Sequence, residues 1–304
     1  MTLHADEVPL SPADARRLIA AQAPQWAHLP LRPAGAGTDN VMLRLGDDLV
    51  VRLPRRPSTA QDVAKEARWI GHLAPHLPVA VPEPVFAGKP DDEYPFEWSV
   101  LRWIDGEHPG SVTVTDWGRF GRDLAGVVAA LHRIDLAGAQ PAGSLHWYRG
   151  ERLSTMADEG REALAEVRRL AQRKDLGLDL DAVAEVWERA AGTPSPELDH
   201  VWLHGDQRSD NLLVREGRLV GVIDFGCLSI GDPTAEHAAV WEFPAVAREA
   251  YREALGLEEA TWLRATAWKV FVNLSGIAYY WDSWPEFAQG CLETVRELIG
   301  EVSG

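Results

Sequence analysis

The sequence of 304 residues is poor in cysteine and contains no long apolar run. Its two cysteines, Cys227 and Cys291, have no metal-ligand spacing and suggest no disulfide framework, so we expect both to be reduced core residues. The longest apolar stretch, residues 270–280, is broken by Asn273 and Ser275. It is shorter than the roughly 20 residues needed to cross a bilayer. We therefore expect no membrane span.

Positive charge is also scarce. The chain has 30 Lys and Arg against 46 Asp and Glu, a formal net charge of −16. A nucleic acid or an anionic membrane surface would be repelled, so we expect neither as a partner. A cationic small molecule would be attracted, although acidity that serves only solubility is the alternative interpretation. Residues 1–12 lack the basic and apolar segments of a secretory signal, so we expect a cytoplasmic protein.

The order of the expected elements indicates an α+β chain. Patterns of alternation and helical spacing predict strands at 29–37, 41–45 and 49–52, a helix at 59–73, and strands at 85–87 and 98–103. From Thr115 onward the apolar residues recur at helical spacing. We predict a bilobal fold, with an antiparallel sheet lobe that contains one helix over residues 1–103 and a larger, mainly helical lobe over residues 104–304.

Three elements in the second half of the chain point to phosphoryl transfer. Asp206 ends a His-Gly-Asp sequence, Asn211 follows five positions later, and Asp224 begins an Asp-Phe-Gly sequence. Protein kinases have the same order, with His-Arg-Asp, an Asn five positions on, and Asp-Phe-Gly. Phosphoryl transfer needs a carboxylate at the attacking hydroxyl and hard oxygen ligands that hold Mg²⁺ on the phosphates. Each residue alone has a structural explanation, but the ordered set favours this chemistry.

The spacing between the two expected metal ligands fits a hairpin. Residues 212–215 and 219–223 form two short strand patterns joined by a tight turn at residues 216–217. Asn211 enters the first strand and Asp224 leaves the second, so antiparallel pairing places both at the same end of the hairpin. One metal ion could therefore bind both side chains.

These motifs resemble those of the aminoglycoside phosphotransferases and related small-molecule kinases of the protein-kinase-like fold. Further similar segments lie at 51–57, 98–107, 131–132 and 231–233. The resemblance implies that Asp206 is the catalytic carboxylate and that Asn211 and Asp224 bind Mg²⁺. It also implies ATP or GTP as the phosphoryl donor. His204 would hold the loop in a structural role.

The resemblance also implies a nucleotide site in the first lobe. A phosphate-covering loop belongs between the first two strands, where the sequence has Gly35, Gly37 and Thr38 but no third glycine in the pattern. The connection after the fifth strand contains Leu101 and Trp103, and its backbone groups would bond to the purine.

Arg52 stands where kinases have a lysine on the third strand. Glu66 in the following helix is its expected partner, because a guanidinium can bind carboxylate or phosphate bidentately. Lys65 is the competing cation, but one residue from Glu66 it should point about 100° away around the helix. Val50 shares a strand face with Arg52 and would line the adenine pocket. The alternative interpretation is that Arg52 and Glu66 are ordinary surface charges.

The favoured acceptor is cationic, of the aminoglycoside type. Asp158, Glu159 and Glu162 lie at the start of a predicted helix that borders the acceptor cleft in relatives, and Asp158 and Glu162 share one face. Their alternative role is a favourable interaction with the helix N-terminus. Glu236 is assigned to the same acceptor group, or to bracing the active-site loop.

Other functions stay open. The acceptor could instead be a macrolide, a peptide antibiotic, or a metabolic alcohol such as choline or homoserine. A nucleotide-binding pseudokinase that regulates a partner is the alternative from a different class. Arg52 in place of lysine favours the pseudokinase, whereas the intact Asp206, Asn211 and Asp224 oppose it.

Overall fold

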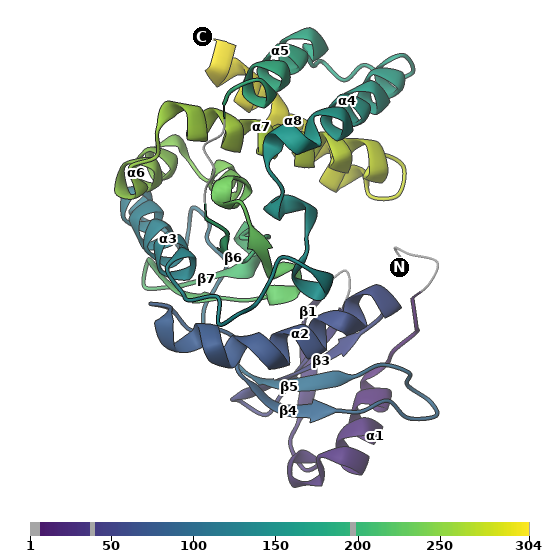
Figure 1. The fold of residues 1–304 in the computed structure, drawn as a ribbon. Coiled ribbons are helices and arrows are strands. Elements are labelled where there is room, and N and C mark those ends of the chain that lie inside the picture. Colours follow the sequence, from purple (N-terminus) through teal and green to yellow (C-terminus); the bar gives the residue numbers. More distant parts are fainter. Residues whose placement is uncertain (1–6, 37–39, 195–198, 304) are drawn as a thin grey trace. The chain divides into compact units, whose positions relative to one another are not determined.

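The structure is a computed structural model that describes residues 7–36, 40–194 and 199–303 (Figure 1). The chain divides into two compact units: Met1–Thr115 with Asp210–Leu228, and Asp116–Ser209 with Ser229–Gly304. A segment from the second half of the sequence therefore belongs to the N-terminal unit. No helix within the described ranges is long and apolar enough to span a membrane.

A five-stranded antiparallel sheet organises the first unit, with the strand order β1-β2-β3-β5-β4. Its strands are Leu31–Ala36 (β1), Asn40–Leu45 (β2), Leu49–Pro54 (β3), Pro84–Gly88 (β4) and Trp98–Arg102 (β5). The turn between β2 and β3 contains Gly46 at a φ of 63°, a conformation that glycine adopts without strain. The predicted strands and their antiparallel pairing are confirmed.

Two helices accompany this sheet, α1 (Pro12–Gln22) and α2 (Pro57–Leu73), whereas the sequence interpretation had only the second. That interpretation was wrong because it overlooked a capping box, in which the side chains of Ser11 and Asp14 each bond to the other's backbone amide. Helix α2 starts two residues earlier than expected, since proline is favoured in the first turn.

Strand β3 presents its side chains to two different environments. Val51 and Leu53 belong to the core that α1 helps to form. Successive residues of a strand point to opposite faces, so Val50 and Arg52 lie on the other face. There Arg52 forms an ion pair with Glu66 of α2.

A second, short sheet in the first unit carries the expected metal ligands. It is the predicted hairpin of β7 (Leu212–Arg215) and β8 (Arg218–Val222). Its turn residues Glu216 and Gly217 have φ values of 53° and 74°, as a tight hairpin turn requires. Ala80 anchors the hairpin, because its amide donates to Val220 O at 2.9 Å and its carbonyl accepts from Val222 N at 3.0 Å.

The second unit is mainly helical. Its helices are α3 (Trp117–His132), α4 (Ala157–Ala171), α5 (Leu180–Ala191), α6 (Ala245–Leu255), α7 (Glu259–Tyr280) and α8 (Pro285–Ser303). Helix α3 packs beside α6, and α7 packs against α8 (Figure 1). The approach of α3 to α6 requires Gly121, because a Cβ there would lie 2.2 Å from Ala247 O.

Short elements of the second unit hold the loop that contains Asp206. Strand β6 (Val201–Leu203) pairs antiparallel with β9 (Ser229–Gly231). A 3₁₀ helix, η8 (Pro233–Glu242), follows β9, and its N-cap Asp232 accepts a hydrogen bond from Thr234 N. Both cysteines are free, as expected, but Cys227 is only half-buried, so its assignment to the core was wrong.

Candidate active site

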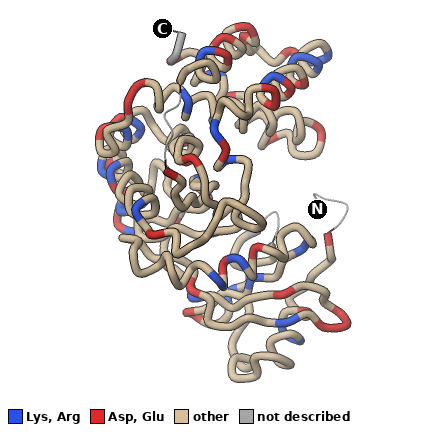
Figure 2. The backbone as a smooth tube through the Cα atoms, viewed as in Figure 1, with Lys and Arg blue, Asp and Glu red and all other residues tan. Residues whose placement is uncertain are grey.

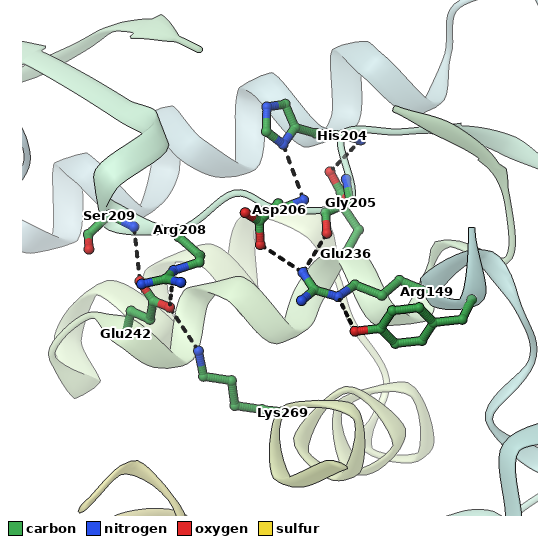
Figure 3. Close-up of polar contacts among 10 residues, drawn as sticks. Arg149, His204, Gly205, Asp206, Arg208, Ser209, Glu236, Glu242 and Lys269 are labelled. Atoms are coloured by element: carbon green, nitrogen blue, oxygen red, sulfur yellow. Dashed lines mark hydrogen bonds and ion pairs between the residues drawn. The ribbon is translucent and has the colours of Figure 1, made fainter. Parts of the chain in front are cut away.

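The His-Gly-Asp loop follows directly after β6 and is fixed by Glu236 from η8. The Glu236 carboxylate accepts hydrogen bonds from His204 N at 3.0 Å and from Gly205 N at 2.9 Å (Figure 3). The amide of Asp206 donates to His204 Nδ1 at 3.2 Å. Gly205 has a φ of 79°, which disfavours any residue with a side chain. The hydrogen bonds that the side chains of Glu236 and His204 accept from the loop's backbone amides therefore determine the loop conformation.

Arg149 binds the Asp206 carboxylate, and the sequence interpretation missed it. Its Nη1 donates to Asp206 Oδ1 at 2.8 Å and to Gly205 O at 2.6 Å (Figure 3). Its Nε donates to Tyr148 OH at 3.1 Å. The two paired side chains are only 21% and 26% exposed. Arg149 therefore fixes one oxygen of the expected catalytic carboxylate.

The electrostatic environment keeps Asp206 ionised. Burial alone would raise its pKa, but the positive charge and hydrogen bond of Arg149, together with the charge of Arg208, bring the pKa below its usual value. A carboxylate with a lowered pKa is a hydrogen-bond acceptor at neutral pH. Asp206 can therefore receive a hydrogen bond from an alcohol.

A close backbone contact positions Arg149. The carbonyl of Gly150 accepts a hydrogen bond from Asp232 N at 2.8 Å. A Cβ on Gly231 would lie 2.2 Å from Gly150 O, so the chain can pass here only with glycine at residue 231. The pair of glycines was the only local signal of this arrangement in the sequence.

Asp206 and Arg149 line a cavity of about 340 Å³ within the second unit. Four further charged side chains reach it, from the loop, from η8 and from α7: Arg208, Glu236, Glu242 and Lys269. An alcohol in this cavity can lie next to the Asp206 carboxylate.

Glu242 is the centre of a second charge cluster in the cavity. Its Oε1 accepts a hydrogen bond from Lys269 Nζ at 3.0 Å and lies 3.7 Å from Arg208 Nε (Figure 3). Its Oε2 accepts from Ser209 N at 2.9 Å. Burial would raise the pKa of Glu242, but Lys269, Ser209 and Arg208 lower it overall. The structure thus places Arg208 beside Glu242, a partner that sequence reasoning did not consider.

In the first unit, Arg52 and Glu66 form a buried ion pair, and the more exposed carboxylate of Asp224 lies beside it. Arg52 Nη1 lies 2.5 Å from Glu66 Oε1, and both side chains are less than 5% exposed. Arg52 Nη2 lies 3.7 Å from Asp224 Oδ1. Burial raises the pKa of Glu66, and the charge of Arg52 opposes that rise. The Asp-Phe-Gly carboxylate is thus adjacent to the cation on β3.

Lys65 also reaches the Asp-Phe-Gly segment, through a different contact. Its Nζ donates to Gly226 O and lies 3.1 Å from Asp62 Oδ1. Asp62, which sequence reasoning missed, has a pKa raised by burial. Asp62, Lys65 and Glu66 are three and four residues apart on α2, the spacing that places side chains near one another on a helix. That spacing was the sequence signal from which Asp62 could have been identified.

Asn211 and Asp224 lie at the same end of the β7–β8 hairpin. Ile223 N donates to Asn211 O at 2.9 Å, so the residue after Ile223 emerges beside Asn211. Asp224 has a φ of 61°, unusual for a residue with a side chain, and its Oδ1 accepts from Gly226 N at 3.3 Å. One carboxylate and one amide oxygen suit Mg²⁺, which takes further ligands from phosphate and water. No group of three or more His, Cys, Asp or Glu side chains able to hold a metal occurs in the described ranges.

The other expected nucleotide residues occupy neighbouring strands. Val50 of β3 pairs in register with Leu101 of β5, and both are buried. Trp103 N donates to Asp48 O at 2.8 Å. Gly35 lies near the end of β1 with a φ of 106°. Gly37 and Thr38 lie outside the described residues, so the phosphate-covering loop stays a prediction.

The acidic residues expected to hold the acceptor lie apart from the cavity. Asp158, Glu159 and Glu162 are exposed on α4, and none of them lines the cavity that contains Asp206. Asp158 instead pairs with Arg161 at 2.8 Å. Their role in acceptor binding therefore gains no support from the arrangement of side chains, whereas Glu236 does line the cavity.

Comparisons with known proteins identify the family and the fold of the chain. A family model described as "Phosphotransferase enzyme family" matches residues 30–268. A search of curated proteins finds no match. The GDP complex of wild-type aminoglycoside 2'-phosphotransferase-IIIa has a similar structure, with a TM-score of 0.77, 20% identity, and coverage of 96% of this chain and 100% of that chain.

Two further solved structures share the fold. The streptomycin-ATP-APH(2'')-IIa ternary complex has a TM-score of 0.64 at 17% identity and covers 96% of this chain and 99% of that chain. The macrolide 2'-phosphotransferase MphH from Brachybacterium faecium has a TM-score of 0.64 at 23% identity, with coverage of 93% and 98%. The predicted kinase-like α+β fold and the predicted resemblance to phosphotransferases are confirmed.

Proposed function

We infer that this chain, which belongs to the phosphotransferase enzyme family, transfers the terminal phosphoryl group of ATP or GTP to a hydroxyl of a small molecule. The observation that carries the proposal is the ionised Asp206 carboxylate at a cavity large enough for part of an alcohol. Solved structures of the same fold contain GDP or ATP, and one contains streptomycin. These complexes support the choice of donor and of a small acceptor.

We assign nucleotide binding to the first unit. Arg52 would bind phosphate oxygens, and Glu66 holds its guanidinium in place by the buried ion pair. Asn211 and Asp224 would hold Mg²⁺. The bound ion would neutralise charge on the phosphates.

We assign activation of the acceptor hydroxyl to Asp206. Arg149 donates to its Oδ1, and the carboxylate would accept the hydrogen bond of the attacking hydroxyl and take its proton. Glu236 keeps the loop in the conformation that presents this carboxylate. Direct transfer requires no covalent enzyme intermediate.

The test is a panel of hydroxylated acceptors with Mg²⁺ and either ATP or GTP. Aminoglycosides and macrolides come first, because phosphotransferases of both substrate classes share the fold. Acceptor-dependent nucleotide consumption should fall by about 10²-fold or more in Asp206→Asn, because the general base is lost. The variant should still bind the nucleotide. Normal turnover in Asp206→Asn would refute the assignment.

The matched control is Arg161→Gln. Arg161 also pairs with carboxylates in the second unit, but it lies on the exposed surface away from the cavity. We expect this variant to keep wild-type turnover. A similar loss in both variants would indicate general destabilisation rather than a role for Asp206.

A further inference from the structure

The cavity beside Asp206 differs in charge from the rest of the chain. Three carboxylates and three cations line it: Asp206, Glu236, Glu242, Arg149, Arg208 and Lys269. Their formal charges cancel, whereas the whole chain carries −16. Figure 2 shows acidic residues in elements along the entire chain. The excess negative charge therefore lies outside this cavity.

Each of the three carboxylates already has donors from the protein. Asp206 Oδ1 accepts from Arg149, and both oxygens of Glu236 accept from backbone amides. Glu242 Oε1 accepts from Lys269, and its Oε2 accepts from a backbone amide. An ammonium group that entered would have to share a carboxylate with donors that the protein already provides.

Protonation of Glu236 makes the cavity more positive. Burial raises the pKa of Glu236 to about 7, although two backbone amides oppose the rise. When Glu236 is protonated, the six side chains carry one net positive charge. Protonation of Glu236 therefore makes the cavity less favourable for a cation.

The remaining wall is largely apolar. Trp268, Val272 and Phe287 line it together with Cys291. Burial raises the pKa of the Cys291 thiol to about 11, so this group is neutral. Such a wall favours an acceptor with an apolar face.

We propose that the acceptor is an alcohol that carries no ammonium group near its reacting hydroxyl and presents an apolar face to this cavity. The inference rests on the proposed function, because it takes the cavity beside Asp206 as the acceptor site. It differs from the cationic acceptor that the net charge of the chain suggested. The substrate class follows from six side chains rather than from the overall charge.

The experiment compares two probes that share a hydroxylated skeleton. Kanamycin carries several ammonium groups, and its fully N-acetylated derivative carries none. Both are titrated calorimetrically at low salt into the protein saturated with Mg²⁺ and a non-hydrolysable nucleotide. Wild-type protein should bind kanamycin no more tightly than the acetylated derivative. Preference for kanamycin by tenfold or more, reduced by Glu242→Gln, overturns the proposal.

The converse test removes the two cationic side chains that pair with Glu242. In Arg208→Gln/Lys269→Met the freed carboxylate should bind an ammonium group, and kanamycin affinity should rise by about tenfold over wild type. An unchanged affinity overturns the claim that these cations exclude ammonium groups. Arg208→Gln alone is the substitute if the double variant does not fold, and it should show a smaller gain in the same direction.

The control variant frees carboxylates elsewhere. Arg161→Gln releases Asp158 and Glu188 on the surface of the same unit, and it should leave kanamycin affinity unchanged. An equal gain in this variant overturns the assignment of the effect to the cavity. Failure of the wild type to bind the Mg²⁺-nucleotide would refute the proposed function, while the kanamycin titrations would still test the charge argument.

Discussion

Removal of Arg149 tests whether this residue sets the ionisation of Asp206. Arg149→Met keeps most of the aliphatic stem and deletes the guanidinium that contacts Asp206 Oδ1 and Gly205 O. Burial then acts on the carboxylate without its main opposing charge. We expect the Asp206 pKa to rise, so that the acid limb of the pH-rate profile moves to higher pH.

The size of the shift follows from the contact. The side chains of Arg149 and Asp206 are 21% and 26% exposed, so solvent screens the pair only in part. A hydrogen bond to a charged group contributes about 1.5–3 kcal/mol. About 1.4 kcal/mol corresponds to one pH unit, so the acid limb should move upward by about one to two pH units. The sign is fixed, because loss of a cation favours the protonated carboxylate.

Two measurements check this prediction. The first is the pH dependence of kcat with any acceptor that the panel identifies. The second needs no acceptor: ¹³C NMR titration of labelled aspartate carboxyls, with the Asp206 signal assigned from Asp206→Asn. Arg149→Lys should bring the Asp206 pKa part of the way back to its wild-type value. It returns the positive charge but not the planar guanidinium that donates to two acceptors. An unmoved Asp206 titration in Arg149→Met would refute the reasoning, and Arg161→Gln serves as the control.

Four further predictions concern the rest of the site. Asp224→Ala should weaken binding of Mg²⁺-nucleotide in calorimetry, and affinity equal to wild type would contradict its role as a ligand. Arg52→Lys should retain part of the triphosphate affinity that Arg52→Ala loses, because the lysine ammonium keeps the charge but not the bidentate geometry of the guanidinium. Lys65→Met should also weaken Mg²⁺-nucleotide binding, through its contact with the Asp-Phe-Gly backbone, but less than Arg52→Ala; the reverse order would reassign the phosphate cation. The pKa of Glu236 is raised above its ordinary 4.5 to about 7, so its contribution to stability is complete at low pH and lost as pH rises through 7. The melting temperature of wild type minus that of Glu236→Gln should therefore fall between about pH 5 and 8, and a constant difference would contradict the raised pKa.

Motifs that depend on short-range geometry were readable in the sequence. The β7–β8 hairpin follows from two strand patterns and a turn, and its register then brings Asn211 and Asp224 to one end. The contact between Arg52 and Glu66 follows from a strand and the next helix in the chain. The capping box of Ser11 and Asp14 is equally local, so helix α1 was also predictable from the sequence.

Arg149 and Glu242 were not predictable in the same way. Arg149 is 57 residues from Asp206, and Ser209 is 33 residues from Glu242, so no periodic pattern connects the partners. Their contacts depend on how several short elements pack in the second unit. Gly150 and Gly231 allow one of these approaches, but a glycine in a loop does not identify the segment that it meets.

The charge of the cavity beside Asp206 and the net charge of the chain lead to different expectations for the acceptor. Net charge is a sum over the whole surface, and it governs long-range attraction. At 0.1 M salt, screening limits that attraction to about 10 Å, so discrimination at the reacting hydroxyl depends on the nearest side chains. In the cavity these include Arg149, Arg208 and Lys269, which offset the local carboxylates although the chain as a whole is acidic. Under the proposed function, an acidic chain can attract cations to its surface while its acceptor site disfavours them, because long-range attraction and local contacts depend on different sets of charges.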